Sequence, residues 1–249
     1  MGVWLKLKDL ALQIAGACSV RDIRVGLRYS AVMLETGAVG VAFSFLARRT
    51  EEAPSQKEVL SLVGKKATDL IELFNSSSPA GSSLALATIN ALFNSPAKDY
   101  IRGDILSHIE IGPKDTVAMI GYFAPLVAPL EAKAKEVRIF EQVPVPEAGI
   151  HPAAEAFDWL PRCQVVLITA TAIINNSIDL LLRSCVSCKQ VAILGPSTPL
   201  VPEAFCGTPV TLLSGIVVKD GPQMLEIVSQ GGGTRLFRQC SCKVNLKIK

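Results

Sequence analysis

The sequence predicts an α/β protein in two parts, an α+β domain over residues 1–110 and a parallel α/β domain over residues 111–249. Two observations support this prediction. Before Pro113 the apolar segments come as strands first and helices afterwards, which is typical of α+β domains. After Pro113, short and continuously apolar segments alternate with helical ones, which indicates a parallel sheet covered on both faces.

The composition favours a folded chain and excludes several function classes. Of the 249 residues, 49% are hydrophobic and 19% charged, which is enough apolar material for a core and too little charge for disorder. The net charge is +3 and the Lys and Arg residues are scattered, so nothing predicts nucleic-acid binding. The longest uncharged runs, 116–130 and 163–178, are shorter than the roughly 20 residues of a membrane span. We expect a cytoplasmic protein.

In the first domain, periodicity and turn residues predict the elements. Thr36-Gly37 is a typical hairpin turn between two strand-like segments, and residues 76–79 separate two helical ones. The predicted helices lie at residues 5–17, 70–74 and 84–93. The predicted strands are residues 21–34 and 39–45, and the charged residues 48–52 with Pro54 are expected to form a loop.

The second domain is expected to contain five parallel strands. Their ranges are 116–120, 136–140, 164–169, 190–194 and 210–217. The helical segments between and after them are 126–135, 153–160, 177–185, 199–205 and 223–228, and residues 143–151 form a proline-rich loop. Because ligands of parallel sheets bind at the carboxyl ends of the strands, the residues that follow each strand are the candidates for a binding site.

The first strand ends in Gly121-Tyr122-Phe123. A dinucleotide-binding turn needs three glycines, but here a single glycine is followed by two bulky aromatic residues, so a dinucleotide is disfavoured. Glu141 ends the next strand, at the spacing of about 20 residues at which an acidic residue binds ribose. Two interpretations remain open: a nucleoside-like or flat aromatic ligand stacked on Tyr122 or Phe123, or core aromatics beside a solvated Glu141.

Two further strands end in short polar residues. After the third strand, Asn176 and Asp179 are predicted to cap the following helix, which leaves Thr169, Thr171 and Asn175 at the ligand edge of the sheet. All three carry side chains that donate and accept hydrogen bonds. They are therefore candidate ligand-binding residues.

After the fourth strand comes Gly195-Pro196-Ser197-Thr198-Pro199. Thr198 is the expected N-cap of a short helix with Pro199 at its first position, which leaves Ser197 free to face a ligand. Pro199 and Pro202 remove backbone N–H donors, so this turn is a poor phosphate site and a stiff corner.

Glycines mark two further places along the chain. In the fifth strand, Ser214-Gly215 indicates a close backbone approach or a bulge. The glycines of residues 231–233 indicate a linker in preference to a loop over the site.

Seven cysteines, an odd number, favour free thiols over a disulfide framework. Cys185 and Cys188 form a C-x-x-C motif, and Cys240 and Cys242 form a C-x-C motif. Four thiols suffice for a tetrahedral metal site. These pairs, however, lie far apart in the sequence, and the first ends a helix on the side opposite the ligand edge. We therefore predict that the four do not jointly bind zinc, and no metal ligand is assigned.

The histidines and hydrolase motifs give no catalytic signature. His108 and His151 have no paired-ligand spacing, and no G-x-S-x-G motif is present. His151 is the histidine expected near the crevice, where it is either a general base or, with greater weight, an ordinary loop residue.

These motifs, taken together, resemble the family called "putative heavy-metal chelation domain" with its usual N-terminal partner. The resemblance is carried by residues 81–93, 121–127, 169–179, 195–199 and 214–216. It implies an enolase N-terminal-like domain followed by a Rossmann-like domain, with a site between the two that includes Asn90. It also implies heavy-metal chelation, or condensation or hydrolysis in the making of pterin-, flavin- or siderophore-like molecules. Ala170 departs from the glycine common in the family and narrows any pocket.

Three functions remain open: an enzyme acting on a heterocyclic or chelator-like metabolite, a non-catalytic protein that binds a metal or metal chelate, and a structural partner protein. The expected partner is a small molecule, with neither nucleic acid nor membrane, and a homodimer is a further expectation. Cofactor and catalytic residues are unassigned. The predicted ligand-binding residues are Asn90, Gly121, Tyr122, Phe123, Glu141, Thr169, Thr171, Asn175, Asn176, Gly195, Pro196, Ser197, Ser214 and Gly215.

Overall fold

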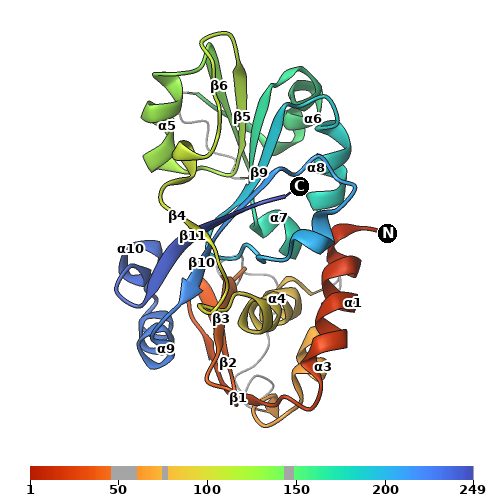
Figure 1. Ribbon diagram of the computed structural model, residues 1–249, viewed down its shortest axis with the longest axis vertical. Helices are drawn as coiled ribbons and strands as arrows, with labels where there is room; N and C mark the ends of the chain where they lie inside the picture. The colour runs from red at the N-terminus through yellow and green to blue at the C-terminus, as the bar shows by residue number, and fades with distance from the viewer. Residues whose placement is uncertain (46–60, 75–77, 143–148, 249) are drawn as a thin grey trace.

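The computed structural model describes residues 1–45, 61–74, 78–142 and 149–248 and shows an α/β fold with two sheets (Figure 1). A three-stranded antiparallel sheet comes from the N-terminal part, and an eight-stranded, mostly parallel sheet comes from the rest of the chain. The predicted loop at residues 48–54 and most of the predicted proline-rich loop lie outside the described residues. None of the helices in the described ranges has the length and apolar character needed to cross a bilayer.

The three-stranded sheet has the order β1-β2-β3. Its elements, with the helices around it, are α1 (Val3–Ala15), β1 (Val20–Val25), β2 (Tyr29–Leu34), β3 (Val39–Phe43), α3 (Ala67–Ile71) and α4 (Pro79–Phe93). The hairpin turn at Gly37 is confirmed, with a φ of 82° that suits glycine. The single strand expected over residues 21–34 is wrong, because the chain turns back at Gly26 to form β1 and β2. Gly26 lies so close to the Val228 carbonyl that a Cβ would overlap it.

The larger sheet has the order β4-β11-β10-β9-β8-β5-β6-β7. Its strands are β4 (Ile101–Arg102), β5 (Thr116–Ile120), β6 (Glu136–Glu141), β7 (Ile150–Pro152), β8 (Val165–Thr169), β9 (Gln190–Leu194), β10 (Leu212–Val218) and β11 (Ser241–Lys247). The strands from β10 to β7 are parallel, and β11 pairs antiparallel both with β10 and with β4. Chain order reverses between β5 and β8, and such a switch point leaves a crevice at the carboxyl ends of the strands.

The helices of the larger part are mostly short. They are α5 (Ala124–Glu131), α6 (Ala156–Trp159), α7 (Thr171–Ile174), α8 (Ile178–Ser184), α9 (Gly221–Ser229) and α10 (Thr234–Phe237). The helix expected at residues 199–205 begins later, at Pro202, as the 3₁₀ turn η4 (Pro202–Phe205), so Thr198 is not its N-cap. The sequence pattern also missed α7, α10, β4 and β11, which are too short or too polar to show a period.

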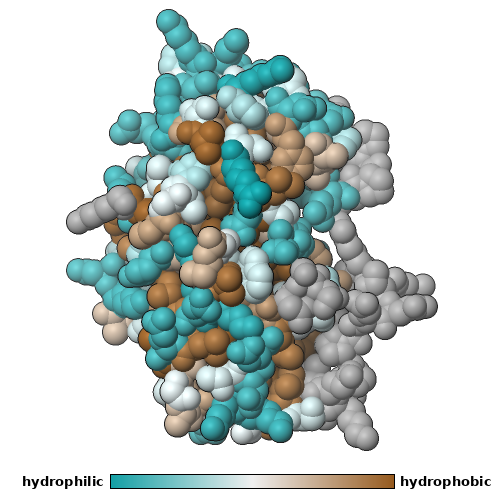
Figure 2. All heavy atoms as spheres, turned by 90° about the vertical axis from the view of Figure 1, so that its right-hand side faces the viewer, coloured by the Kyte–Doolittle hydropathy of each residue, from teal (hydrophilic) through white to brown (hydrophobic). Residues whose placement is uncertain are grey.

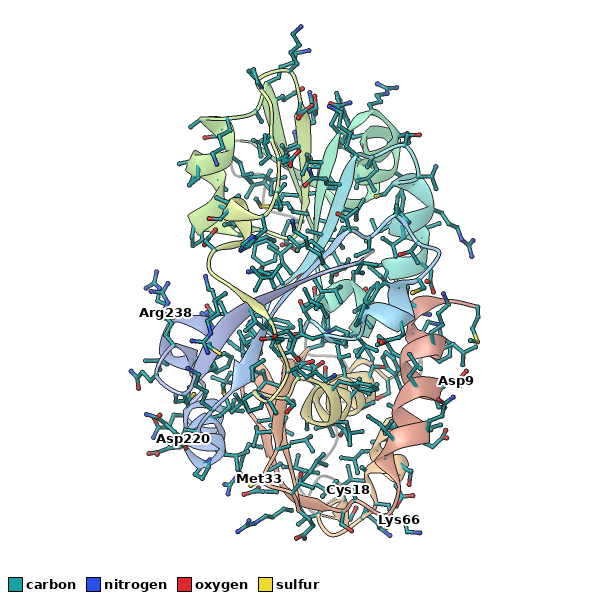
Figure 3. All side chains as sticks on the ribbon, viewed as in Figure 1. Asp9, Cys18, Met33, Lys66, Asp220 and Arg238 are labelled. Carbon is teal, nitrogen blue, oxygen red and sulfur yellow. The ribbon has the colours of Figure 1, made fainter. Side chains whose placement is uncertain are left out.

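The two parts are joined by packing as well as by the chain. The three-stranded sheet lies between α4 and α9 (Figure 1), so a helix from beyond residue 111 covers one face of the N-terminal sheet. Alternate residues of β2 face opposite ways: Val32 packs in the cluster of α4, whereas Met33 packs with Met224 of α9. The Asp220 side chain begins α9 by accepting the N–H of Gln223 at 2.9 Å (Figure 3).

The N-terminal sheet packs closely against α4. Gly40 of β3 touches α4 so closely that a Cβ would overlap the Ala87 carbonyl oxygen, and the strand can lie against this helix only with glycine there. On the side of α1, hydrophilic side chains surround scattered apolar ones (Figure 2). Single exposed apolar residues, such as Ile14 and Leu180, are ordinary on a protein surface.

Candidate functional site

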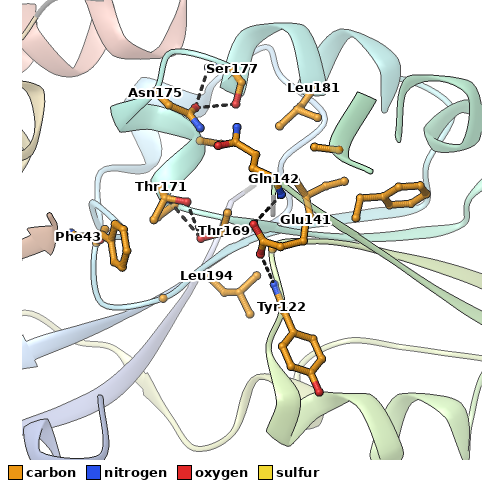
Figure 4. A pocket seen from close by; sticks show the side chains of 18 of the residues that line it. Phe43, Tyr122, Glu141, Gln142, Thr169, Thr171, Asn175, Ser177, Leu181 and Leu194 are labelled. Carbon is orange, nitrogen blue, oxygen red and sulfur yellow. Dashed lines mark hydrogen bonds between the residues drawn. The ribbon is translucent and has the colours of Figure 1, made fainter. Parts of the chain in front are cut away.

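A crevice of 570 Å³ lies at the carboxyl ends of β5, β6, β8 and β9, where the ends of β2 and β3 meet the larger sheet (Figure 4). The structure brings ten of the fourteen predicted residues together around it. They are Gly121, Tyr122, Phe123, Glu141, Thr169, Thr171, Asn175, Gly195, Pro196 and Ser197. The crevice therefore lies at the switch point of the sheet, which is where such sheets bind ligands.

The other four predicted residues do not line the crevice. Asn90 is buried in α4 behind its wall, and Asn176 is exposed with a left-handed φ of 59°. Ser214 and Gly215 lie behind the turn that follows β9: the Ser214 carbonyl accepts the N–H of Gly195 at 3.1 Å, and Gly215 touches Thr198. Asn90, Ser214 and Gly215 therefore lie behind the wall and support it, whereas Asn176 does neither.

The Glu141 carboxylate is fixed at the crevice by two backbone N–H groups. Its Oε2 accepts the N–H of Tyr122 at 3.0 Å, and its Oε1 accepts the N–H of Gln142 at 2.7 Å (Figure 4). The bond from Tyr122 joins the ends of two neighbouring strands, β5 and β6. The side chain is thus held in place before any ligand binds.

Phe123 blocks the approach to both glycine turns. Gly121 and Gly195 have φ values of 90° and 115°, and a Cβ on either would lie 3.7 Å or 4.0 Å from the Phe123 ring. A pyrophosphate would have to approach the backbone where this ring lies. The Tyr122 ring, in contrast, points away from the crevice, and the residue is 49% exposed, so the part of Tyr122 in the site is its backbone N–H (Figure 4).

Polar groups on the α7 side face the crevice in pairs. The hydroxyls of Thr169 and Thr171 lie 3.0 Å apart, and the Asn175 Oδ1 accepts the Ser177 hydroxyl at 2.7 Å. The predicted cap by Asn176 and Asp179 is wrong, because Ser177 is the residue that precedes α8 and it makes no side-chain cap. The extra turn α7 shifts the start of the helix by one residue.

The turn after β9 is fastened to the N-terminal part. The Ser197 Oγ accepts the N–H of Phe43 at 2.8 Å, and its carbonyl accepts the Asn90 amide at 3.1 Å. Asn94 donates to the Thr198 carbonyl at 3.0 Å and accepts the Leu200 N–H at 2.9 Å. The expectation that Ser197 is free is therefore wrong, since its oxygen already holds β3.

Three aromatic lining residues come from the N-terminal part and were not predicted, and Ser44 lies among them. Tyr29, Phe43 and Phe45 lie near the ends of β2 and β3, and Phe43 packs edge-on against the other two, with ring centres 5.7 Å and 5.3 Å apart. Burial raises the pKa of Tyr29 to about 12. The only sequence signal that could have placed these residues at the crevice was the gathering of aromatic residues at these strand ends.

The cysteine pairs and His151 lie elsewhere. Cys240 packs against Met224, whereas Cys188 lies near the Leu160 carbonyl at 3.5 Å. In the described ranges, no three His, Cys, Asp or Glu residues are grouped so that they could hold a metal ion. His151 lies 3.4 Å from Glu155 and does not line the crevice.

Two family models match the chain, and both are described as "Putative heavy-metal chelation". They cover residues 104–247 and residues 8–93. The chain belongs to the "putative heavy-metal chelation" family. An uncharacterised protein of Methanocaldococcus jannaschii is 25% identical over 240 residues, which are 92% of this chain and 90% of the relative.

Two solved structures show that the family shares this fold along its whole length. A protein of unknown function from Pyrococcus horikoshii is similar with a TM-score of 0.85 at 24% identity, covering 99% of this chain and 100% of its own. One from Desulfitobacterium hafniense has a TM-score of 0.85 at 25% identity, covering 99% and 98%. Both are described as members of the DUF364 family, in agreement with the match over residues 104–247.

Proposed function

We propose that this family member binds a flat small organic molecule in the crevice between its two sheets. The observation that carries the proposal is the convergence of Phe123, Glu141 and Thr171 from three strand ends on one crevice of 570 Å³. Aromatic walls with a few fixed polar groups are what small-molecule sites present. A pterin-, flavin-precursor- or nucleoside-like molecule has the matching flat surface and polar edges.

The residues of the crevice favour a binding function over a catalytic one. Its described lining contains no histidine, cysteine or lysine, so the usual pairing of a nucleophile with a base is not found there. Glu141 is the one described lining residue with a carboxylate that could move a proton. Condensation or hydrolysis would have to use this group with the Thr169 and Thr171 hydroxyls as hydrogen-bond partners.

A metal or metal-chelate binding protein is the second candidate, because both family models carry that description. The donor set does not fit a bare ion: the described residues contain no group of three metal-ligating side chains, and the described lining holds a single carboxylate. A metal would therefore have to arrive already bound to an organic chelator. Action in the cytoplasm and assembly as a homodimer stay predictions.

Thermal-shift and calorimetric titrations test the proposal. The ligands are pterin, lumichrome and guanosine, with NAD, ATP and Zn²⁺ or Ni²⁺ alone for comparison. We expect a neutral heterocycle to bind, and NAD and ATP to fail at millimolar concentration. Phe123→Ala and Thr171→Val should weaken that binding, whereas Phe93→Ala, at the far end of α4, should not.

Three outcomes would overturn the proposal. They are micromolar NAD binding that Glu141→Ala weakens, tight binding of a metal ion alone, and a neutral ligand whose affinity is unchanged in both crevice variants.

A further inference from the structure

Among the described residues that line the crevice, the charge is of one sign only. Glu141 is the only charged side chain among its described lining residues, and no Lys, Arg or His is found among them. A ligand that carries phosphate or carboxylate groups would meet this carboxylate with no counter-charge from the described lining. Because charges interact more strongly in a crevice of low dielectric constant than in water, this imbalance selects for the charge of the ligand.

The Glu141 carboxylate has capacity left for a ligand. Each of its oxygens accepts one backbone N–H, from Tyr122 or Gln142, and a carboxylate oxygen has room for a second hydrogen bond. No ion pair within the described part of the chain neutralises it. The backbone N–H groups orient the carboxylate, but they leave its negative charge for whatever enters the crevice.

Aromatic side chains line the same crevice as this carboxylate. Tyr29, Phe43 and Phe45 contribute rings from the N-terminal sheet, and Phe123 contributes one from the larger sheet. The interplanar angles of 85° for Tyr29 with Phe43 and 82° for Phe43 with Phe45 mean that these rings present differently directed faces and edges. The face of an aromatic ring carries partial negative charge and attracts cations.

We infer that the ligand of this crevice is an organic cation, a flat ring system with a positive charge that lies among these rings beside Glu141. The inference rests on the proposed small-molecule function and adds the charge of the ligand to it. Rings together with one carboxylate replace the hydration of an organic cation, whereas a phosphate or carboxylate ligand gains nothing from either group. The Phe123 ring would stack on the ligand, and the Glu141 oxygens would accept its N–H groups or balance its charge.

Three probes of nearly equal shape test this inference: N-methylquinolinium, which is a cation, quinoline, which is neutral, and quinoline-3-carboxylate, which is an anion. Calorimetric titration of the wild-type protein at neutral pH should give affinities in that order, with about a tenfold advantage for the cation over the neutral probe. Glu141→Gln should remove most of this advantage. Glu131→Gln, an equal charge change at the exposed end of α5, should leave it intact.

The outcomes separate this inference from the proposed function. If quinoline binds as tightly as the cation, or if the anion binds best, the charge assignment is wrong and the flat-ligand proposal stands. If none of the three binds, the charge assignment is also wrong, and the neutral heterocycles decide the proposed function separately. Should Glu141→Gln fail to fold, the order of the three probes on the wild-type protein still decides.

Discussion

The Asp179 carboxylate, in the first turn of α8, accepts a hydrogen bond of 2.8 Å from the backbone N–H of Val3, 176 residues earlier in the chain. Val3 is the first residue of α1, and Gly2 before it has no side chain to cap that helix. Asp179 therefore supplies the cap from another element. The bond fastens the N-terminal helix to the larger part of the molecule.

We expect Asp179→Ala to lower the free energy of unfolding by about 1 kcal/mol, the usual cost of losing a helix cap. Urea denaturation followed by circular dichroism measures this. Asp99→Ala, which removes an exposed carboxylate in a loop, serves as the control and should change stability little. Equal stabilities of the two variants would contradict the capping role.

We expect the loss of Asn94 to lower the free energy of unfolding more than the loss of Asp179. Asn94→Leu leaves the Leu200 N–H and the Thr198 carbonyl buried without partners, so we expect a loss of about 2–4 kcal/mol. The same denaturation experiment measures it, with the exposed Gln230→Leu as the matched exchange. A loss below that of the control would show that the turn after β9 finds other partners.

Acid should weaken the ion pair at the start of β5. The pKa of Asp115 is lowered, first by the Gly112 N–H at 2.8 Å and then by the Lys189 ammonium at 3.0 Å. A depressed pKa in the folded state gives stability that is present above the ordinary pKa of about 4 and is lost as the pH falls through the folded value.

Asp115→Asn should therefore destabilise the protein at pH 7, and the difference from the wild-type protein should shrink as the pH falls below about 4. Denaturant titrations across this range measure it, with Asp99→Asn as the control. A difference that stays constant with pH would exclude this linkage.

Cys188 should be more reactive than an ordinary cysteine. Its pKa is lowered because the Cys185 thiol donates a hydrogen bond to its sulfur, while that same bond and then burial raise the pKa of Cys185. We expect Cys188 to be alkylated by iodoacetamide with a pH midpoint below about 8.5. Peptide mapping by mass spectrometry follows the reaction.

The variant Cys185→Ala removes the donor, and the midpoint for Cys188 should then rise toward the ordinary value. Cys18→Ala, an exchange in a different region of the chain, should leave the midpoint unchanged. The same midpoint in the wild-type protein and in Cys185→Ala would disprove the role of the hydrogen bond.

Much of the larger sheet could be predicted because its strands are buried on both faces. Residues 117–120 and 191–194 are continuous apolar runs, and the strands predicted over 116–120 and 190–194 match β5 and β9 residue for residue. β11 was missed because it is a polar strand next to the edge of the sheet, with exposed or half-exposed residues such as Lys243. Its place in the sheet comes from pairing with β10 and not from a pattern of its own.

The sequence by itself determined the α/β class and the strand ends that meet at the crevice, since parallel strands bring their carboxyl ends to one edge. Only the tertiary structure decided which side chains are free to act there. Ser197 is held by Phe43, and Asp179 is held by Val3, because hydrogen bonds between residues more than 150 positions apart leave no trace in local spacing. Local spacing likewise does not show that Tyr29 and Phe43 reach the crevice from the other sheet.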